Sequence, residues 1–147
     1  DYLLGSHRVI AGKRESFRSA HLSGKSAVDP DEFAITNTDS KFLKSMEKAI
    51  MDNLNDPEFG LEQLAEAMIV SRSTLIRKVK GLLNVTPNEY IKVVRLNVAA
   101  TMLSNGADRI NDVCYAVGFN TPSYFAKCFK KQFGQLPADY MKEHRGE

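Results

Sequence analysis

The stretch Val117–Lys131 reads VGFNTPSYFAKCFKK, and its spacing decides the fold. Two sets of side chains recur in and just beyond it at every fourth residue, one aromatic and one small or basic: Phe125, Phe129 and Phe133, and Ser123, Lys127 and Lys131. This spacing places each set on its own face of an α-helix. We expect the aromatic face to be core rather than a stacking or cofactor surface. The other face carries no acid, so it is either a solvated surface or one shaped for phosphates.

The overall composition does not indicate which class of partner the chain binds, so the distribution of charge along the sequence has to be considered. The chain has 147 residues, 43% hydrophobic and 26% charged, enough for one domain or two very small ones. Its net charge of +2 does not by itself indicate a nucleic-acid partner. Between residues 71 and 95, however, a single acid (Glu89) stands among several bases: Arg72, Arg77, Lys78, Lys80, Lys92 and Arg95. Positive charge is therefore concentrated locally.

Cys114 and Cys128 are too few for a disulfide framework and lie among apolar residues. We expect them to be buried free thiols in a reducing, cytoplasmic location, because no second Cys or His lies at zinc-ligand spacing. No apolar run approaches the roughly 18 residues that span a bilayer, so we expect no membrane contact. The chain begins with Asp rather than Met, and we expect a fragment of a longer protein.

The sequence offers no catalytic arrangement. Neither a nucleophile–base pair nor a Gly-rich phosphate loop can be assembled from its residues, and its histidines lie in expected tails or ends. We therefore expect a protein that is not an enzyme and that holds neither a cofactor nor a metal.

Periodicity predicts an all-α protein of about seven helices. Residues 1–39 are expected to be a partly helical extension and linker, and residues 40–147 a helical domain. Thr38, Asp39 and Ser40 can cap the first helix of that domain. A long helix should begin at Pro87 and end at Asn105–Gly106.

The chain also repeats itself. When it is shifted along itself by 50 residues, the segment that begins at Ser71 falls on the segment that begins at Thr121. Under this offset Leu75, Arg77, Val79, Pro87 and Tyr90 match Phe125, Lys127, Phe129, Pro137 and Tyr140. Each copy reads as a short helix, a tight turn and a basic second helix. That is the helix-turn-helix arrangement, whose second helix can enter the major groove of DNA. We expect one unit over residues 61–84 and another over 110–133, joined by a linker helix over 87–104.

Two segments resemble the AraC-type DNA-binding domain: RLNVAATML at Arg95–Leu103 and INDVCYAVGFNTPSYFAKCFKKQFGQLPADY at Ile110–Tyr140. The resemblance covers about residues 41–144. It implies a transcription regulator whose two helix-turn-helix units, bridged by a linker helix, bind adjacent major-groove segments of double-stranded DNA.

A second resemblance concerns the start of the chain. DYLLGSHRVIAGKRESF at Asp1–Phe17 is similar to the tail that follows a receiver domain in response regulators and hybrid two-component proteins. It implies a missing upstream receiver, control by a phosphorelay and a homodimer formed through upstream domains.

The exposed faces and the AraC-type resemblance together predict the DNA contacts. They are Ser71, Arg72, Ser73, Ile76, Arg77 and Lys80 in the first unit, and Asn120, Thr121, Ser123, Tyr124, Lys127, Lys130 and Lys131 in the second. We expect Arg77 and Lys127 to contact base edges or nearby phosphates. Lys78, Arg95 and Lys130 are expected to contact phosphate or water rather than bases. Ile76 is either a partly buried side chain or an apolar contact to a thymine methyl.

The first turn departs from the family pattern, because Ile69 stands where the family usually carries Gly. A β-branched residue resists positive φ, so this turn is either reshaped or strained.

An alternative function, of a different class, is that of a helical protein-interaction module that contacts RNA polymerase or another regulator. The basic, acid-free face of Tyr124–Lys131 argues against it.

Overall fold

The computed structural model describes residues 37–107 and 109–145, which form seven α-helices and no strand. In chain order these are α3 (Asn37–Asp52), α4 (Leu61–Met68), α5 (Arg72–Leu83), α6 (Pro87–Ser104), α7 (Ile110–Ala116), α8 (Pro122–Phe133) and α9 (Pro137–Arg145). The prediction of an all-α fold is confirmed. The extension predicted for the start of the chain lies almost wholly outside the described residues. Among the described helices, none combines the length and the apolar character that crossing a bilayer requires.

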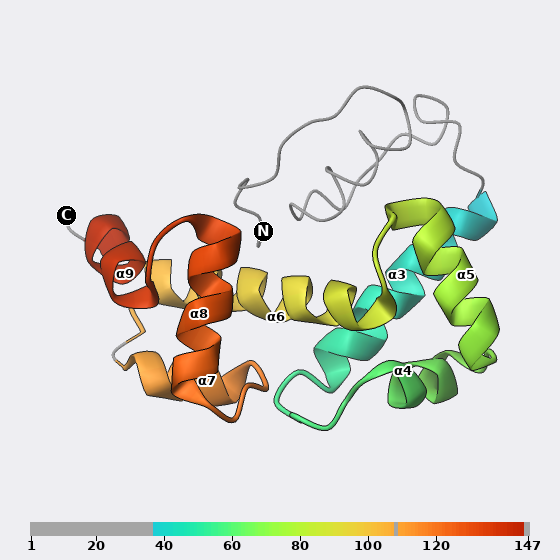
Figure 1. The fold of residues 1–147 in the computed structure, drawn as a ribbon, viewed down its shortest axis with the longest axis horizontal. Coiled ribbons are helices and arrows are strands. Elements are labelled where there is room, and N and C mark those ends of the chain that lie inside the picture. Colours follow the sequence, from blue (N-terminus) through green and yellow to red (C-terminus); the bar gives the residue numbers. More distant parts are fainter. Residues whose placement is uncertain (1–36, 108, 146–147) are drawn as a thin grey trace.

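The long helix α6 runs through the middle of the molecule and joins two groups of helices (Figure 1). Helices α3, α4 and α5, the first half, pack around its N-terminal part, and α7, α8 and α9, the second half, around its C-terminal part. Helices α5 and α8 cross α6 in a similar direction, each beginning on the side where α4 and α7 lie. The repeat read in the sequence is therefore also a repeat in space.

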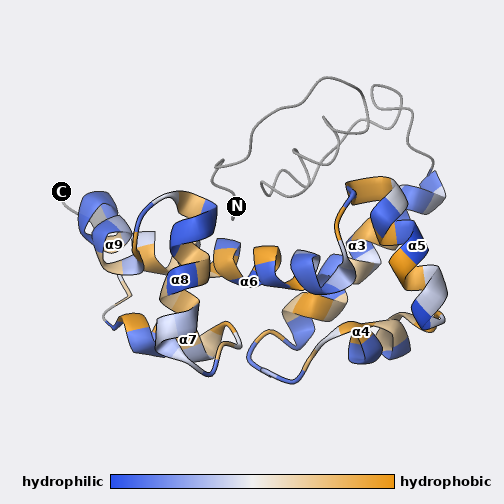
Figure 2. Cartoon of the chain, viewed as in Figure 1, coloured by the Kyte–Doolittle hydropathy of each residue, from blue (hydrophilic) through white to orange (hydrophobic). Residues whose placement is uncertain are grey.

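Each half has its own hydrophobic core, and α6 contributes to both. It gives Tyr90, Ile91 and Val94 to the first core and Leu96, Ala99, Ala100 and Leu103 to the second. A helix that is apolar on several sides must be buried from several sides, as we predicted for this one. The other helices bury one side, and hydrophobic and hydrophilic segments alternate along them in Figure 2. The two cores meet along α6 at Arg95.

Local signals fix the ends of α6. The Thr86 hydroxyl accepts a hydrogen bond from the Glu89 N–H (3.1 Å), and the Thr86 N–H donates to the Glu89 carboxylate (2.8 Å). These reciprocal bonds form a capping box, and Pro87 occupies the first turn. The helix ends at Ser104, Asn105 is its C-cap, and Gly106 follows with φ of 95°. The predicted bounds of this helix are confirmed.

The predicted start of α3 is wrong. The helix is already formed at Asn37, so Thr38, Asp39 and Ser40 lie within its first turn instead of capping it. Asp39 explains in part why the helix includes these residues, because an acid in the first turn interacts favourably with the helix dipole. Its carboxylate also lies 4.0 Å from the Lys78 ammonium group of α5.

The turns of the two helix-turn-helix units have the same backbone geometry. Ile69 adopts a left-handed conformation (φ 57°, ψ 50°), as Gly118 does with φ of 92°. In both turns the next N–H donates to a carbonyl five residues earlier, Val70 to Ala65 and Phe119 to Cys114, each at 3.0 Å. The first turn is therefore strained rather than reshaped, and the strain amounts to about 1–2 kcal/mol. The Ile69 side chain is 90% exposed, so packing does not offset it.

Both cysteines are buried free thiols, as predicted. Burial raises the pKa of the Cys114 thiol, which lies 3.7 Å from the carbonyl oxygen of Phe119. Each therefore behaves as a small core side chain.

The aromatic face of α8 forms the centre of the second core. Phe125 and Phe129 are fully buried, and Phe133 packs against them partly exposed. The ring of Phe129 lies 4.6 Å from that of Phe133 and meets Tyr140 of α9 edge-on at 5.3 Å. The prediction that this face is core is confirmed.

Replacing Phe129 with alanine should lower the free energy of unfolding by about 3–5 kcal/mol, because the lost ring leaves a cavity. Urea denaturation followed by circular dichroism measures the change. Tyr115→Ala on α7, where the side chain is half-exposed, is the matched control and should cost about 1 kcal/mol or less. Equal losses in the two variants would show that Phe129 is not a core residue.

Candidate nucleic-acid interface

The candidate DNA-contact residues all lie on the surface, on α5, on α8 or just before them. Those of the first half are Ser71, Arg72, Ser73, Ile76, Arg77 and Lys80, and those of the second are Asn120, Thr121, Ser123, Tyr124, Lys127, Lys130 and Lys131. The opposite sides of the same helices are buried. The structure thus gathers the candidates into two exposed faces, which we call the α5 face and the α8 face.

On the α5 face, the N-terminal end is ordered by Ser71. Its hydroxyl oxygen accepts from the Thr74 N–H at 3.1 Å and lies 3.3 Å from the Ser73 hydroxyl. Arg72 lies 3.7 Å from a carboxylate oxygen of Glu62, and both side chains are largely exposed. Such a surface pair is weak, so it leaves the guanidinium available to a phosphate. Ile76 is 40% exposed and therefore available to an apolar partner.

The α8 face is basic and carries a tyrosine near its N-terminal end. Tyr124 is half-exposed, and its ring lies 6.0 Å from that of Phe119. The ammonium group of Lys92, on α6, lies 5.9 Å from the centroid of the same ring. Lys127, Lys130 and Lys131 extend along the helix, and all three are exposed. This side of α8 therefore presents positive charge without a competing acid on the same helix.

The structure contradicts one of the predicted phosphate contacts and gives another a neighbour on α3. Arg95 is only 5% exposed, so the expectation that it meets phosphate or water is wrong. Lys78 is partly exposed; its ammonium group lies 4.0 Å from the Asp39 carboxylate and 5.1 Å from the centroid of the Phe42 ring, so its role stays a prediction. Arg95 was assigned to phosphate or water because sequence alone does not show which carbonyls the fold brings near it. Lys130 is exposed, and its role stays a prediction.

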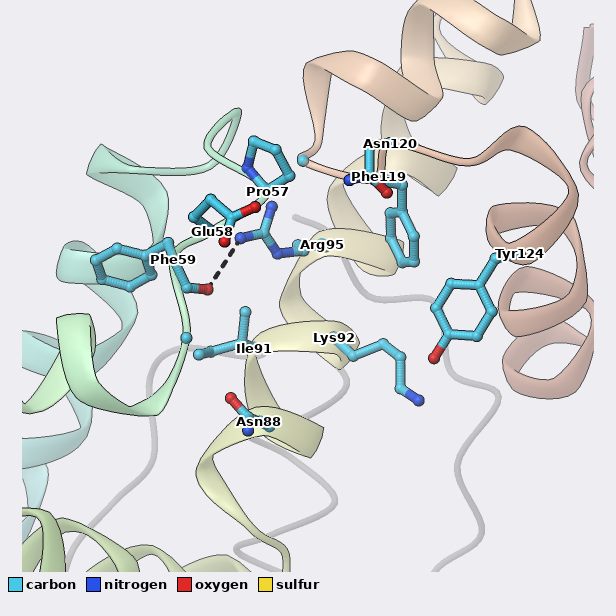
Figure 3. Close-up of a pocket in the computed structure, with 12 residues that line it drawn as sticks. Pro57, Glu58, Phe59, Asn88, Ile91, Lys92, Arg95, Phe119, Asn120 and Tyr124 are labelled. Carbon is cyan, nitrogen blue, oxygen red and sulfur yellow. Dashed lines mark hydrogen bonds between the residues drawn. The ribbon is translucent and has the colours of Figure 1, made fainter.

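The buried Arg95 binds four backbone carbonyl groups. One guanidinium nitrogen donates to the carbonyls of Leu54 (2.6 Å) and Val117 (2.7 Å). The other donates to those of Asp56 (2.9 Å) and Phe59 (3.3 Å), and Figure 3 shows the bond to Phe59. Three of these carbonyls belong to the loop between α3 and α4, and the fourth to the turn between α7 and α8. Arg95 therefore ties the two halves to each other and to α6.

The charge on Arg95 persists despite its burial. Burial lowers the pKa of the guanidinium, and the neighbouring carboxylate of Asp56 acts in the opposite direction. Because an arginine stays protonated in proteins, the group remains a cation with its donors directed at carbonyl oxygens. Hydrogen bonds from a charged donor are the stronger kind. The relative orientation of the α5 and α8 faces depends on this group.

Gly118 is required by the same arrangement. A Cβ atom there would lie 1.2 Å from a guanidinium nitrogen of Arg95 and 2.4 Å from the Leu54 carbonyl oxygen. Its φ of 92° is also in the left-handed region. At the equivalent place in the first turn, Ile69 points into solvent. This contrast explains why one turn tolerates a side chain and the other does not.

Two polar side chains of α6 position the neighbouring helices. The side-chain oxygen of Asn97, which is 4% exposed, accepts from the Gln132 amide of α8 at 2.7 Å. The side-chain oxygen of Asn88 accepts from the Leu61 N–H at the start of α4 (3.1 Å). Sequence reasoning missed both, together with the role of Arg95. For Arg95 alone, the available signal of burial was the stripe of α6 on which Ile91, Arg95 and Ala99 recur at every fourth residue.

Comparison with known proteins agrees with this geometry. A family model described as "Helix-turn-helix domain" matches residues 64–143. The chain is 36% identical over 125 residues to Histidine kinase P4 of Formosa agariphila, covering 85% of this chain and 9% of that protein. It is 29% identical over 103 residues to the HTH-type transcriptional regulator MtrA of Neisseria gonorrhoeae, covering 70% and 34%. The chain thus spans a small part of both relatives.

Among solved structures, the chain is similar to the C-terminal domain of AraT, a response regulator from Geobacillus stearothermophilus. The TM-score is 0.63 and the identity 27%, covering 68% of this chain and 83% of that one. The chain belongs to the AraC-type family of helix-turn-helix DNA-binding domains, which confirms the resemblance read from its second half.

Gly118→Ala should lower the free energy of unfolding by more than about 3 kcal/mol, because the new methyl group displaces Arg95 in addition to straining the backbone. Gly134→Ala is the matched control: its φ is 82°, and a Cβ there meets nothing within 4 Å. That variant should lose only the backbone cost of about 1–2 kcal/mol. Chemical denaturation of both variants measures the difference. Equal losses would contradict the steric role assigned to Gly118.

Proposed function

We propose that this chain is the DNA-binding output domain of a bacterial transcription regulator, and that α5 and α8 read adjacent major-groove segments of one site. The observation that carries the proposal is the pair of exposed, basic faces on two helices whose relative orientation is held by Arg95. A regulator of this kind works in the cytoplasm, where the bacterial chromosome lies.

The two faces supply the two kinds of contact that a specific site needs. Phosphate contacts from Arg72, Lys80, Lys130 and Lys131, together with hydroxyl groups at the helix N-terminal ends, set register and orientation. Base edges are read by Arg77 on α5 and by residues such as Lys127 on α8, with Ile76 available to a thymine methyl. All of these side chains are exposed.

The length of α6 limits how the site is read. Its 18 residues span about 27 Å, whereas successive major-groove faces on one side of B-DNA lie ~34 Å apart. Two rigidly spaced helices then bend the duplex or engage one segment incompletely. Bending a site costs on the order of 1–6 kcal/mol, which the second set of contacts offsets. Because the two faces differ, the site is non-palindromic and covers about two helical turns.

Control by a phosphorelay is part of the proposal. It is supported by the names of two similar proteins, a histidine kinase and a response regulator. In this arrangement an upstream receiver brings two copies together, and the DNA-bound domain contacts RNA polymerase.

The role of Arg77 can be tested on a duplex selected from a random library by the wild-type protein. Arg77→Ala should weaken binding to the selected duplex by roughly 1–3 kcal/mol and relax the preference at one base pair. Binding to random duplexes should change little. Lys48→Ala, on exposed α3 surface, is the control and should bind as wild type does. Equal losses on selected and random duplexes would reassign Arg77 to a phosphate.

Joint reading by α5 and α8 predicts a strict dependence on spacing. Inserting five base pairs between the two segments turns the second segment to the opposite face of the duplex, since one turn takes about 10 base pairs. Affinity should then fall to that of one segment alone, as measured by fluorescence anisotropy and footprinting. An insertion that leaves affinity and footprint unchanged would show that the two halves do not read DNA together.

A further inference from the structure

A cleft of about 300 Å³ opens between the two halves, beside the α8 face. Its walls come from the loop before α4, from α6, from the turn before α8 and from α8 itself (Figure 3). Asn120 and Tyr124, both candidate DNA contacts, line it, so the cleft is continuous with the α8 face. None of the contacts proposed above uses its α6 wall.

Lys92 is the cation of this cleft that remains available. Its side chain is partly buried on α6 and extends toward Tyr124, whose ring centroid lies 5.9 Å from the ammonium nitrogen (Figure 3). It has no salt bridge to any residue that the structure describes. A cation over an aromatic face is held in place but keeps its N–H donors for an acceptor. Arg95, the other cation lining the cleft, is already bound to backbone carbonyls.

The neighbouring polar groups suit an anion with several oxygen atoms. Asn88 uses its side-chain oxygen to accept from the Leu61 N–H, so its amide NH₂ is the end left to donate. Asn120 is exposed on the opposite wall and carries a second amide. Glu58, the acid that lines the cleft, is exposed at its edge. One ammonium and two amides therefore face a space larger than a single phosphate group.

We propose that Lys92 binds a phosphate of the DNA backbone that connects the two major-groove segments. This inference rests on the proposed function. A strand that leaves the groove read by α5 must pass between the halves before it reaches the groove read by α8. Because α6 is shorter than the groove spacing, the duplex bends toward the protein, which brings its central phosphates close to α6. Lys92 thus positions the bent duplex and reads no base.

The first test is the salt dependence of binding to the selected duplex. Lys92→Gln removes one phosphate contact, so the slope of log affinity against log salt should become shallower by about 0.9. Between 50 mM and 200 mM salt, the variant should lose roughly 3.5-fold less affinity than the wild type does. Lys48→Gln should leave the slope unchanged. Glu58→Gln, which removes the acid from the same cleft, should tighten binding instead. A full wild-type slope for Lys92→Gln would overturn the proposal.

The second test locates the phosphate. Neutral methylphosphonates are placed one at a time across the centre of the selected duplex. One central substitution should weaken binding by the wild type and by Lys48→Gln, and should have no further effect on Lys92→Gln. A penalty of equal size in all three proteins would overturn the proposal. If selection yields no specific duplex at all, the proposed function itself fails, and this result is distinct from specific binding that ignores Lys92. Thermal melting of each variant confirms that it is folded.

Discussion

The bonds from the Arg95 guanidinium to four backbone carbonyls hold the two halves of this protein in one orientation. Besides these bonds the halves share α6 and the contact of Leu54, from the loop between α3 and α4, with the second core. Burying a charge is expensive, and it is tolerated only where its donors are satisfied. The loop between α3 and α4 and the turn between α7 and α8 must therefore approach Arg95 together. That requirement favours one arrangement of the two halves over many similar ones. The spacing between the α5 face and the α8 face follows from this arrangement.

The helices and their exposed faces could be predicted because both follow from spacing along the chain. Recurrence at every fourth residue separates Phe125 and Phe129 from Lys127 and Lys131 without any knowledge of tertiary contacts. The role of Arg95 could not be predicted in this way, because its partners are backbone carbonyls that leave no mark on the sequence. The neighbours of Lys78 could not be predicted for a related reason: Asp39 and Phe42 approach it only when α3 docks on α5.

The two halves repeat the same helix-turn-helix unit, but their turns have different surroundings. Gly118 is confined by the guanidinium, whereas Ile69 occupies the same backbone conformation facing solvent. Turn geometry is thus shared by the copies, while the reason for keeping glycine applies to one of them. A side chain in the left-handed region is a local cost that the first half bears without structural change. At this turn the two copies therefore share a backbone conformation although their residues differ. Elsewhere, similar residues do not mean that the copies could be exchanged.

The shared guanidinium also limits how such domains can recombine. A chimera that exchanged one helix-turn-helix unit for that of a relative would cut through contacts among the 54–59 loop, Arg95 and Gly118. Those three elements lie in different thirds of the domain, so no single crossover point keeps all of them from one parent while still exchanging a whole half. The smallest piece that can be transplanted intact is then the pair of units together with α6. Exposed side chains on α5 and α8 can be changed without disturbing these contacts, whereas an exchange of units cannot avoid them.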